Sequence, residues 1–333
     1  TGVVGIIKGK SATKGRTIGL RADMDALPIH EETGLPYASK TDGAMHACGH
    51  DGHTSMLLGA AKYLAETRNF DGTVVVIFQP AEEGGAGAKA MIDDGLIDRF
   101  GIDEVYGLHN APGVPLGTIM TRPGPLQASA DEFEIVVTGL GGHAAEPHKA
   151  IDTTLVASQI VVTLHSIVSR NVDPLNSVVL TVGTFQTDSN ASNIIPETAR
   201  MRGTVRCLNP EDREKMEARV RRVVEDTASA FGASATLDWE YGYPVTVNHE
   251  DATEWAVEAA RAVANDVDAA ANPIMPSEDF SYMLNERPGT YLFLGNGDSA
   301  MCHHPKYNFN DEAIPYGCSF FAEIVERRMP ASQ

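Results

Sequence analysis

The first part of the chain alternates short apolar runs with stretches whose apolar residues recur every three or four positions. Short apolar runs are typical of buried strands, and the three-to-four spacing is typical of helices packed on a sheet. The expected elements, in chain order, are strands at Val3–Ile7 and Thr17–Arg21, a helix at Thr54–Thr67, a strand at Thr73–Phe78, a helix at Gly87–Asp94 and a strand at Glu104–Leu108. This alternation predicts an α/β domain with a mainly parallel sheet and helices on both faces.

The pattern changes at Arg122-Pro123-Gly124-Pro125. The run Phe133–Val137 alternates apolar and polar residues, as a half-exposed strand does. The elements expected after it are a helix at Ile151–Ser169, strands at Ser177–Phe185 and Ala199–Cys207, a helix at Pro210–Phe231 and a strand at Ala235–Tyr241. This βαββαβ order predicts an inserted α+β domain over residues 121–243, with two helices on one face of a small sheet.

After Tyr243-Pro244 the first pattern resumes. We expect a helix at Thr253–Val267, a helix opened by Ser277-Glu278-Asp279 with Ser277 as its cap, a strand at Thr290–Leu294 and a helix at Ile314–Arg328. The first domain is therefore expected to be discontinuous, formed by residues 1–120 and 244–333.

Composition narrows the class of protein. The chain has 333 residues, of which 43% are hydrophobic, and a formal charge of −19, which argues against nucleic acid or anionic membranes as partners. Without an apolar run of the roughly 18 residues that a membrane span needs, we expect a soluble protein. Four cysteines in so long a chain favour free thiols and a cytoplasmic location. The sequence opens on Thr1 without a signal peptide or initiator methionine, so we expect processing or residues upstream.

Chemically active side chains gather where strand-like sequence gives way to a turn. The segments that carry them are His46–Asp51, Gln79–Gly85, Gly107–His109 and Cys302–Pro305. Open α/β sheets bind ligands beyond the carboxyl ends of their parallel strands, so these groups are expected to share one rim. Thiol, imidazole and carboxylate ligands together indicate a metal-dependent hydrolase.

Each residue also has a plainer explanation. Cys48 and His50 face the same way if their segment is extended, and a helix beginning near His53-Thr54 would lower the pKa of the thiol; alternatively, Cys48 is a buried structural cysteine. Glu82 and Glu83, as neighbours after a strand, point in different directions, so one can bind metal while the other stands free; two acids at a helix N-terminus are the alternative.

Other candidates have similar alternatives. His109 alone is more often structural than a ligand, and Asp23 could simply be a turn residue. Arg206 could hold a substrate carboxylate or serve as a surface ion-pair partner. Glu278 and Asp279 are first interpreted as acids at a helix N-terminus.

The chain resembles the M20 metallopeptidase and amidohydrolase family, in its aminoacylase-like and hippurate-hydrolase-like branch. The matching stretches, in the family's order, are Arg21–Pro28, Cys48–Asp51, Gln79–Glu83, Gly107–His109, Gly142–His148, Asn193–Pro196, Gly203–Arg206, Ser277–Phe280 and His303–Pro305. They span nearly the whole chain. The resemblance implies a catalytic metal-binding domain with an inserted dimerisation or lid domain.

The resemblance also implies a role for individual residues. The metal ligands would be Cys48, His50, Glu83, His109 and His303, and the general base would be Glu82. Asp23 would orient a ligand, and His143 would reach the active site of a dimer partner and stabilise the oxyanion. Asn193 and Arg206 would hold the substrate carboxylate. The implied assembly is a homodimer, with a tetramer left open.

Five ligands of mixed sulfur, nitrogen and oxygen type suit two divalent ions better than one closed tetrahedral site. The resemblance favours Mn²⁺, with Zn²⁺ or Co²⁺ as substitutes. The expected reaction is hydrolysis of the amide bond of an N-acyl amino acid, such as an N-acetyl or N-benzoyl derivative. The acyl group, the amino acid and the pathway are not specified by the sequence.

Three alternatives stay open. A dipeptidase, carboxypeptidase or N-carbamoyl amino acid hydrolase of the same fold is the nearest enzymatic alternative. Cys48 with His50 or His109 and Asp51 could form a thiol-nucleophile amidase, which needs no metal. A non-catalytic metal-binding protein is the third, although it would have no reason to keep a free Glu82 beside a ligand Glu83.

Overall fold

The computed structural model describes residues 2–13 and 15–331, which form two compact units. The larger unit comprises the chain up to Leu126, Thr246–Asn272 and the chain from Glu278 onward, and the smaller comprises Gln127–Val245 with Pro273–Ser277. The sequence pattern places the transitions a few residues earlier. It carries no signal for Pro273–Ser277, where Ile274 forms a single bridge to Gln127 instead of a helix or strand.

Within the described residues, the larger unit is built on a seven-stranded sheet with the strand order β1-β3-β2-β4-β15-β5-β14. The four strands β3, β2, β4 and β15 run parallel, whereas β1 is antiparallel to β3 and β5 is antiparallel to β15. The prediction of a mainly parallel sheet is confirmed. The bounds are β1 (Val3–Lys8), β2 (Thr17–Asp23), β3 (Thr73–Gln79), β4 (Glu104–Pro112), β5 (Thr118–Met120), β14 (Asp266–Asp268) and β15 (Gly289–Gly297).

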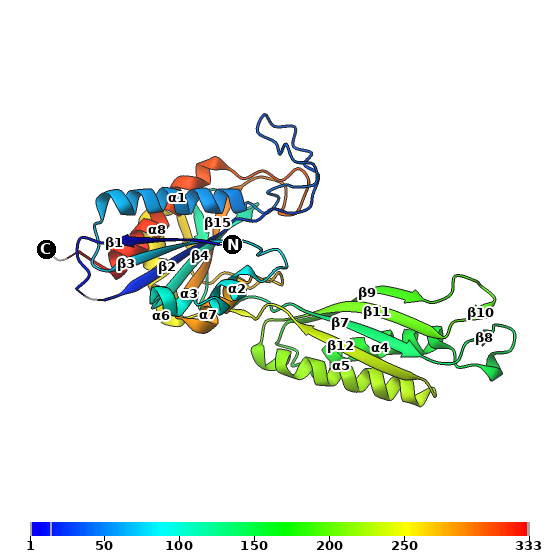
Figure 1. Ribbon diagram of the computed structural model, residues 1–333. Helices are drawn as coiled ribbons and strands as arrows, with labels where there is room; N and C mark the ends of the chain where they lie inside the picture. Colours follow the sequence, from blue (N-terminus) through cyan, green and yellow to red (C-terminus); the bar gives the residue numbers. More distant parts are fainter. Residues whose placement is uncertain (1, 14, 332–333) are drawn as a thin grey trace. The chain divides into compact units, whose positions relative to one another are not determined.

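Helices cover both faces of this sheet, as predicted (Figure 1). Alternate residues of the strands point to opposite faces, so Val74 and Val76 of β3 pack in one core while Val75 and Ile77 pack in the other. One face carries α1 (His50–Thr67), α6 (Glu250–Val263) and α8 (Ile314–Arg328); the other carries α2 (Gly87–Asp93), α3 (Leu96–Phe100) and α7 (Phe280–Glu286). No helix among the described residues has the length and apolar character needed to cross a membrane.

The smaller unit has the predicted βαββαβ order around an antiparallel sheet, β12-β7-β11-β9 (Figure 1). Its two long helices pack on one face, where they share a core with every second strand residue. The bounds are β7 (Asp131–Thr138), α4 (Thr153–Asn171), β9 (Val178–Thr187), β11 (Thr198–Cys207), α5 (Pro210–Ala230) and β12 (Ser234–Tyr241). In this unit a short pair joins β8 (Gly142–His143) to β10 (Ile194–Ile195). A second short pair, which belongs mainly to the larger unit, joins β6 (Gly124–Gln127) to β13 (Thr246–Asn248).

Three expected helix ends are wrong, each for a local reason. Helix α1 begins at His50 and not near Thr54, because Gly49 adopts the left-handed conformation that turns the chain into the helix. Helix α6 ends at Val263, since the next residues pair with β5 as β14. Helix α7 begins at Phe280 with Asp279 as its cap residue, so Ser277 does not cap it.

Candidate metal centre

Three adjacent parallel strands bring their polar groups to one edge of the larger sheet. Strand β2 ends at Asp23, strand β3 leads into the turn that carries Glu82 and Glu83, and His109 lies near the end of β4. Strand β2 lies between β3 and β4 in the sheet, so the three ends are neighbours. The polar groups at these three strand ends therefore lie along one edge of the sheet, as expected.

A tight turn brings Cys48 and His50 into the same cluster. The segment is not extended as expected, because Gly49 has a φ of 86° and the helix starts at the next residue. A Cβ at Gly49 would lie 2.3 Å from Nδ2 of Asn110 and 2.4 Å from the hydroxyl of Tyr307. Only glycine satisfies both the backbone conformation and the space at this position.

All five expected ligands meet at this turn. The ligand atoms of Cys48, His50 and His109 lie within 4.8 Å of one another, and so do those of Cys48, Glu83 and His303. Cys48 is common to both groups. The centre is thus built as two three-residue groups that share one thiol.

Hydrogen bonds fix which nitrogen of the His50 and His109 rings faces the centre. Nδ1 of His50 lies 3.1 Å from a carboxylate oxygen of Asp25, and Nδ1 of His109 donates to the carbonyl of Asn110 over 2.7 Å. Both Nδ1 atoms therefore carry a proton, which leaves each Nε2 with a lone pair. Nε2 of His109 lies 3.4 Å from Sγ of Cys48.

The residues present fit divalent ions. Nε2 of His50 is buried and has no hydrogen-bond partner in the described part of the chain. Oε1 of Glu83 is buried as well, and it lies 3.2 Å from Nε2 of His303 and 3.9 Å from Nε2 of His50 without a well-formed hydrogen bond to either. Such atoms are costly to bury unless a ligand satisfies them. His303, whose side chain is 55% exposed, adopts a φ of 66°, and this strained conformation directs its Nε2 to within 3.2 Å of Glu83.

The surroundings of Cys48 act on its pKa in the direction opposite to the one expected. A hydrogen bond with the thiol of Cys302, burial and the nearby Glu83 all raise the pKa of Cys48. A bound cation would reverse the preference, because a coordinating thiol is deprotonated.

Glu82 lies beside this cluster in a dry, acidic environment. Its side chain is buried, and its carboxylate lies within 4.8 Å of those of Glu278 and Asp279. Burial, together with Glu278, Asp279 and Asp23, raises the pKa of Glu82 well above the usual range of a glutamate. A carboxylate with a raised pKa holds a proton more firmly, which suits a group that must accept one and return it.

Glu278 and Asp279 are more than helix N-terminal acids. Both pair with the fully buried guanidinium of Arg21 at 2.9 Å, and Arg21 also pairs with Asp23 at 2.8 Å. The arrangement places one arginine among three carboxylates near Glu82, so these residues set the charge around the Glu82 carboxylate.

The structure places Asp23 beside a histidine that the sequence interpretation did not include. Oδ1 of Asp23 lies 2.6 Å from Nδ1 of His53, whereas its other carboxylate oxygen, Oδ2, lies 3.7 Å from Nε2 of His50. His53 in turn accepts hydrogen bonds from the backbone and side-chain nitrogens of Asn110, at 2.9 and 3.0 Å.

Asp25, His53 and Asn110 were missed as supports of the centre. Besides contacting His50, Asp25 accepts a hydrogen bond from the backbone nitrogen of Glu83 over 2.9 Å. The only sequence signal was position: each of the three residues lies within three residues of a candidate residue. Nothing in the pattern specified which atoms they contact.

The remaining candidates lie in the smaller unit, at opposite ends of β11. His143 pairs with Ile194 in the β8–β10 ribbon, and the backbone of Asn193 accepts a hydrogen bond from Ala144 beside it. Nδ1 of His143 accepts a hydrogen bond from the backbone of Ala145 over 3.1 Å, so its Nε2 carries the proton and faces outward as a donor. Arg206, near the other end of β11, has a buried Nη1 with no hydrogen-bond partner among the described residues.

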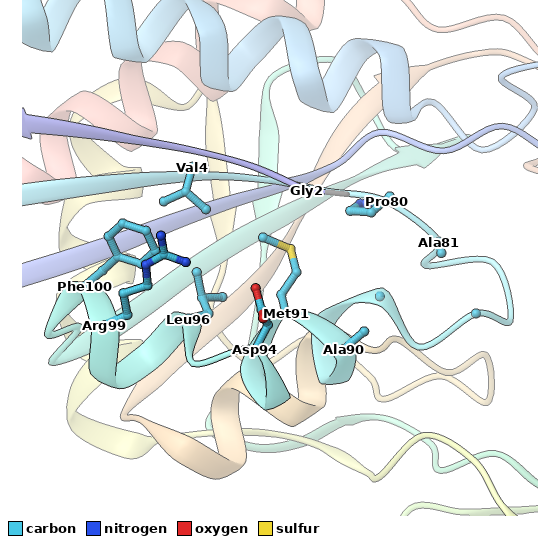
Figure 2. Close-up of a pocket in the computed structure, with 12 residues that line it drawn as sticks. Gly2, Val4, Pro80, Ala81, Ala90, Met91, Asp94, Leu96, Arg99 and Phe100 are labelled. Atoms are coloured by element: carbon cyan, nitrogen blue, oxygen red, sulfur yellow. The ribbon is translucent and has the colours of Figure 1, made fainter.

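A separate cavity of about 720 Å³ lies behind the Glu82 turn (Figure 2). Its walls are Val4 of β1, Met91 of α2, Leu96 and Arg99 of α3, and the backbone around Pro80. None of the five ligand candidates lines it. The centre is therefore defined by its donor atoms and not by this cavity.

Known proteins share both the sequence and the fold. A family model described as peptidase family M20/M25/M40 matches residues 19–327. Hippurate hydrolase of Campylobacter jejuni is 43% identical over 327 residues, which cover 98% of this chain and 84% of the relative. N-acetyl-L-cysteine deacetylase of Bacillus subtilis is 44% identical over 335 residues, which cover 100% of this chain and 79% of the relative.

A solved structure matches as well. The Bacillus subtilis protein YxeP, described as a dinuclear metal-binding peptidase from the M20 family, has a TM-score of 0.85 and 37% identity to this chain. The match covers 99% of this chain and 85% of YxeP.

Proposed function

Because the chain belongs to peptidase family M20/M25/M40, we propose that the Cys48 cluster is the active site of an N-acyl amino acid amidohydrolase. The protein is a metal-dependent hydrolase of amide bonds, and relatives at 43% and 44% identity are named for acyl amino acid substrates. The observation that carries the assignment of the site is the pair of three-residue groups sharing Cys48 beside the buried Glu82.

Five side chains would hold two divalent ions: Cys48, His50, Glu83, His109 and His303. The ions would polarise the amide carbonyl and lower the pKa of a water molecule to about 7. We propose Mn²⁺, with Zn²⁺ or Co²⁺ as substitutes. The thiolate and imidazoles suit Zn²⁺ and the carboxylate suits Mn²⁺, so the choice of Mn²⁺ follows the resemblance to the family and not the ligand chemistry. Asp25 and Asn110 hold the imidazoles of His50 and His109 with Nε2 toward the centre.

Glu82 performs the proton transfers. Its carboxylate accepts a proton from the attacking water and returns that proton to the nitrogen of the leaving amine. The products are a carboxylic acid and a free amino acid. Arg21, Glu278 and Asp279 keep Glu82 in a fixed position and charge environment, while Asp23 fixes His53.

His143 supplies a hydrogen bond to the oxygen that gains negative charge as the carbonyl is attacked. Its Nδ1 is occupied as an acceptor, so its Nε2–H is a donor. Arg206 and Asn193 bind the substrate carboxylate; the unpartnered Nη1 of Arg206 supports this role.

We propose a homodimer in which His143 and Asn193 serve the active site of the partner. Thr198 and Arg206 are eight residues apart on β11, a span of roughly 26 Å at about 3.3 Å per residue, so the two ends of the strand cannot contact one small substrate. Strand β9 is an edge of its sheet and exposes Val179 and Phe185, and α4 beside it exposes Leu155 and Val162. Exposed edges and apolar residues of this kind are surfaces on which two copies can pair.

The cellular location proposed is the cytoplasm. Cys48, Cys207, Cys302 and Cys318 are all free thiols in the structure. Reducing compartments keep thiols in this state.

A thiol-nucleophile amidase is the second candidate, favoured by the 3.4 Å contact between Cys48 and His109. Asp51, the expected third member, is exposed in the first turn of α1, and Nδ1 of His109 bonds to the carbonyl of Asn110 instead. A nucleophile pair of Cys48 and His109 also gives no chemical role to His50, Glu83 and His303, which lie in the same cluster.

Metal dependence distinguishes the two functions. We expect chelation to abolish hydrolysis of N-acetyl and N-benzoyl amino acids and added Mn²⁺ to restore it. Cys48→Ser should bind Mn²⁺ more weakly, since a hydroxyl is a poorer anionic ligand than a thiolate, and excess Mn²⁺ should restore part of its activity. An enzyme that is indifferent to chelator and inactive as Cys48→Ser would contradict the metal assignment and support the thiol nucleophile. A parallel panel of N-carbamoyl amino acids and dipeptides tests the substrate class.

A further inference from the structure

We propose that Cys48 and Cys302 form a reversible disulfide that excludes metal from the active site. The inference rests on the proposed function, because it takes Cys48 as the ligand shared by both metal positions. It makes the Cys48–Cys302 pair a site of oxidative modification.

The two cysteines are already in contact. The thiol of Cys302 donates to the carbonyl oxygen of Cys48 over 3.9 Å. The backbones that carry them are joined as well, since the nitrogen of His303 donates to the carbonyl of Ala47 over 2.7 Å. Residues 254 positions apart in sequence thus lie side by side at the turn before α1.

The segment around Cys302 can make the small adjustment that a disulfide requires. Residues 298–310 contain turns but no helix or strand. Met301 is 64% exposed, whereas Cys48 is only 8% exposed. Disulfide geometry is narrow, so one partner must be free to move, and here that partner is Cys302.

The other two cysteines are held differently. Cys318 lies within α8, and its thiol donates to the carbonyl of Met56 over 3.2 Å. Cys207 is buried at the end of β11 in the core of the smaller unit. Cys318 therefore offers a matched control: a half-buried thiol of the larger unit with a local backbone partner.

The reaction requires a peroxide as oxidant. The Cys302 thiol gives up its proton and its sulfur attacks hydrogen peroxide; the O–O bond breaks, one oxygen stays on the sulfur as a sulfenic acid, and the leaving hydroxide takes the proton and departs as water. The Cys48 thiol then gives up its proton and its sulfur attacks the sulfur of Cys302; the S–S bond forms, the S–O bond breaks, and the leaving hydroxide takes this proton and departs as a second water. Two thiols are oxidised and one peroxide is reduced to two waters, and a dithiol reductant reverses the change.

The disulfide and the metals compete for one sulfur. A disulfide sulfur carries no negative charge, so both three-residue groups would lose their common ligand at once. We therefore expect bound metal to protect Cys48, and loss of metal to expose it to oxidation.

Peptide mapping tests the proposal directly. The purified protein is treated with chelator, exposed to hydrogen peroxide with or without saturating Mn²⁺, digested without reductant and analysed by mass spectrometry. We expect a linked Cys48–Cys302 peptide, two hydrogens lighter than the sum of its parts, which Mn²⁺ suppresses and dithiothreitol removes. Cys302→Ser should hydrolyse substrate at the wild-type rate, form no linked peptide and resist inactivation through this disulfide. Cys318→Ser should form the link as the wild type does.

The outcomes separate this inference from the proposed function. If peroxide converts Cys48 or Cys302 to sulfinic acid without a linked peptide, the disulfide is refuted, and Mn²⁺ binding by Cys48→Ser still tests the ligand role. If the linked peptide forms but the linked protein binds Mn²⁺ as tightly as the reduced protein, the exclusion of metal is refuted together with the ligand role of Cys48. A linked peptide that forms equally well in the presence of saturating Mn²⁺ would also contradict the competition.

Discussion

At the scale of single residues, the proposed function assigns separate tasks to two adjacent glutamates. Glu83 contributes its carboxylate to a three-residue ligand group, whereas Glu82 is buried against Glu278 and Asp279. Two neighbouring residues after a strand point in different directions, so one turn serves both the metal centre and the base.

This division predicts the behaviour of Glu82→Gln. The variant should bind the same amount of metal, because none of the five ligands is changed, and should lose roughly two to four orders of magnitude in turnover, the usual contribution of general acid–base catalysis. Turnover and metal content are measured on the same sample. The matched variant Glu83→Gln should lose metal as well as activity. Near-normal turnover of Glu82→Gln would refute the assignment of the base.

A second residue-scale prediction concerns His53 and pH. Burial, with His109 and His50, lowers the pKa of His53 to about 3 against the opposing effect of Asp23. A histidine in the unfolded chain has a pKa of about 6.5. Above that value the ring is neutral in both states and its contribution to stability is fully present. As the pH falls below about 6.5, the unfolded state binds a proton at this histidine but the folded state does not, so the free energy of unfolding decreases.

The expected slope is about 1.4 kcal/mol per pH unit for this one group, down to the folded pKa. Urea unfolding of the chelated protein at several values between about pH 6 and about pH 4 measures it. His53→Asn should be less stable at neutral pH and should lack this part of the slope. An unchanged slope in the variant would show that His53 is not held neutral.

At the scale of elements, the turn into α1 decides whether the centre forms. Gly49 combines a φ of 86° with close contacts to Asn110 and Tyr307, and its two neighbours are the proposed ligands Cys48 and His50. The start of the helix and the position of the thiol are therefore set by one residue.

Gly49→Ala should destabilise the protein and weaken metal binding. We expect about 1 kcal/mol for the left-handed backbone and about 1–3 kcal/mol for the crowding against Asn110 and Tyr307. Gly43→Ala is the matched control, since Gly43 has a φ of 71° and no atom within 4 Å of an added Cβ. Urea unfolding and Mn²⁺ titration are compared for both. Equal losses in the two variants would mean that the contacts of Gly49 do not matter.

At the scale of the whole molecule, the proposed dimer divides one active site between two chains. If His143 acts on the partner, two inactive variants should complement each other. Mixing His143→Ala with Glu82→Gln creates heterodimers that hold one site with an intact base and an intact partner histidine. Counting sites in a random mixture of symmetric dimers gives about a quarter of wild-type activity per total subunit. Activity is measured after subunit exchange has been demonstrated with differently tagged chains.

The control mixes His143→Ala with Arg206→Ala in the same way, because the proposed arrangement assigns Arg206 to its own chain. That mixture should also regain activity. A mixture of Glu82→Gln with Cys48→Ser, two residues of one site, should not. Absence of complementation in the first mixture, despite exchange, would show that His143 acts within its own chain or has no role in catalysis.

The local pattern determined the element types and much of their extent. Alternating and periodic apolar positions specified the parallel sheet, the βαββαβ unit and helix α8, which spans the expected residues 314–328. Such patterns predict helices and strands because each segment buries one of its own faces, which places its apolar residues at regular intervals along the sequence. The predicted bounds were wrong at Val267, which lies in β14, and at the start of α1. At these places pairing with a distant strand, or the backbone conformation of a single glycine, overrides the helical preference of the local sequence.

The chemistry of the site was indicated by residue types, but its connections were decided by tertiary structure. Asp23, Glu83 and His109 stood just after predicted strands, so their meeting at one edge of the sheet followed from sheet topology. No local pattern could show that Asp25 holds His50, or that Cys302 lies against Cys48. Hydrogen bonds between distant segments depend on side-chain positions that only the packed fold fixes. The sequence therefore indicated the candidate metal ligands, and the structure alone revealed what orients them.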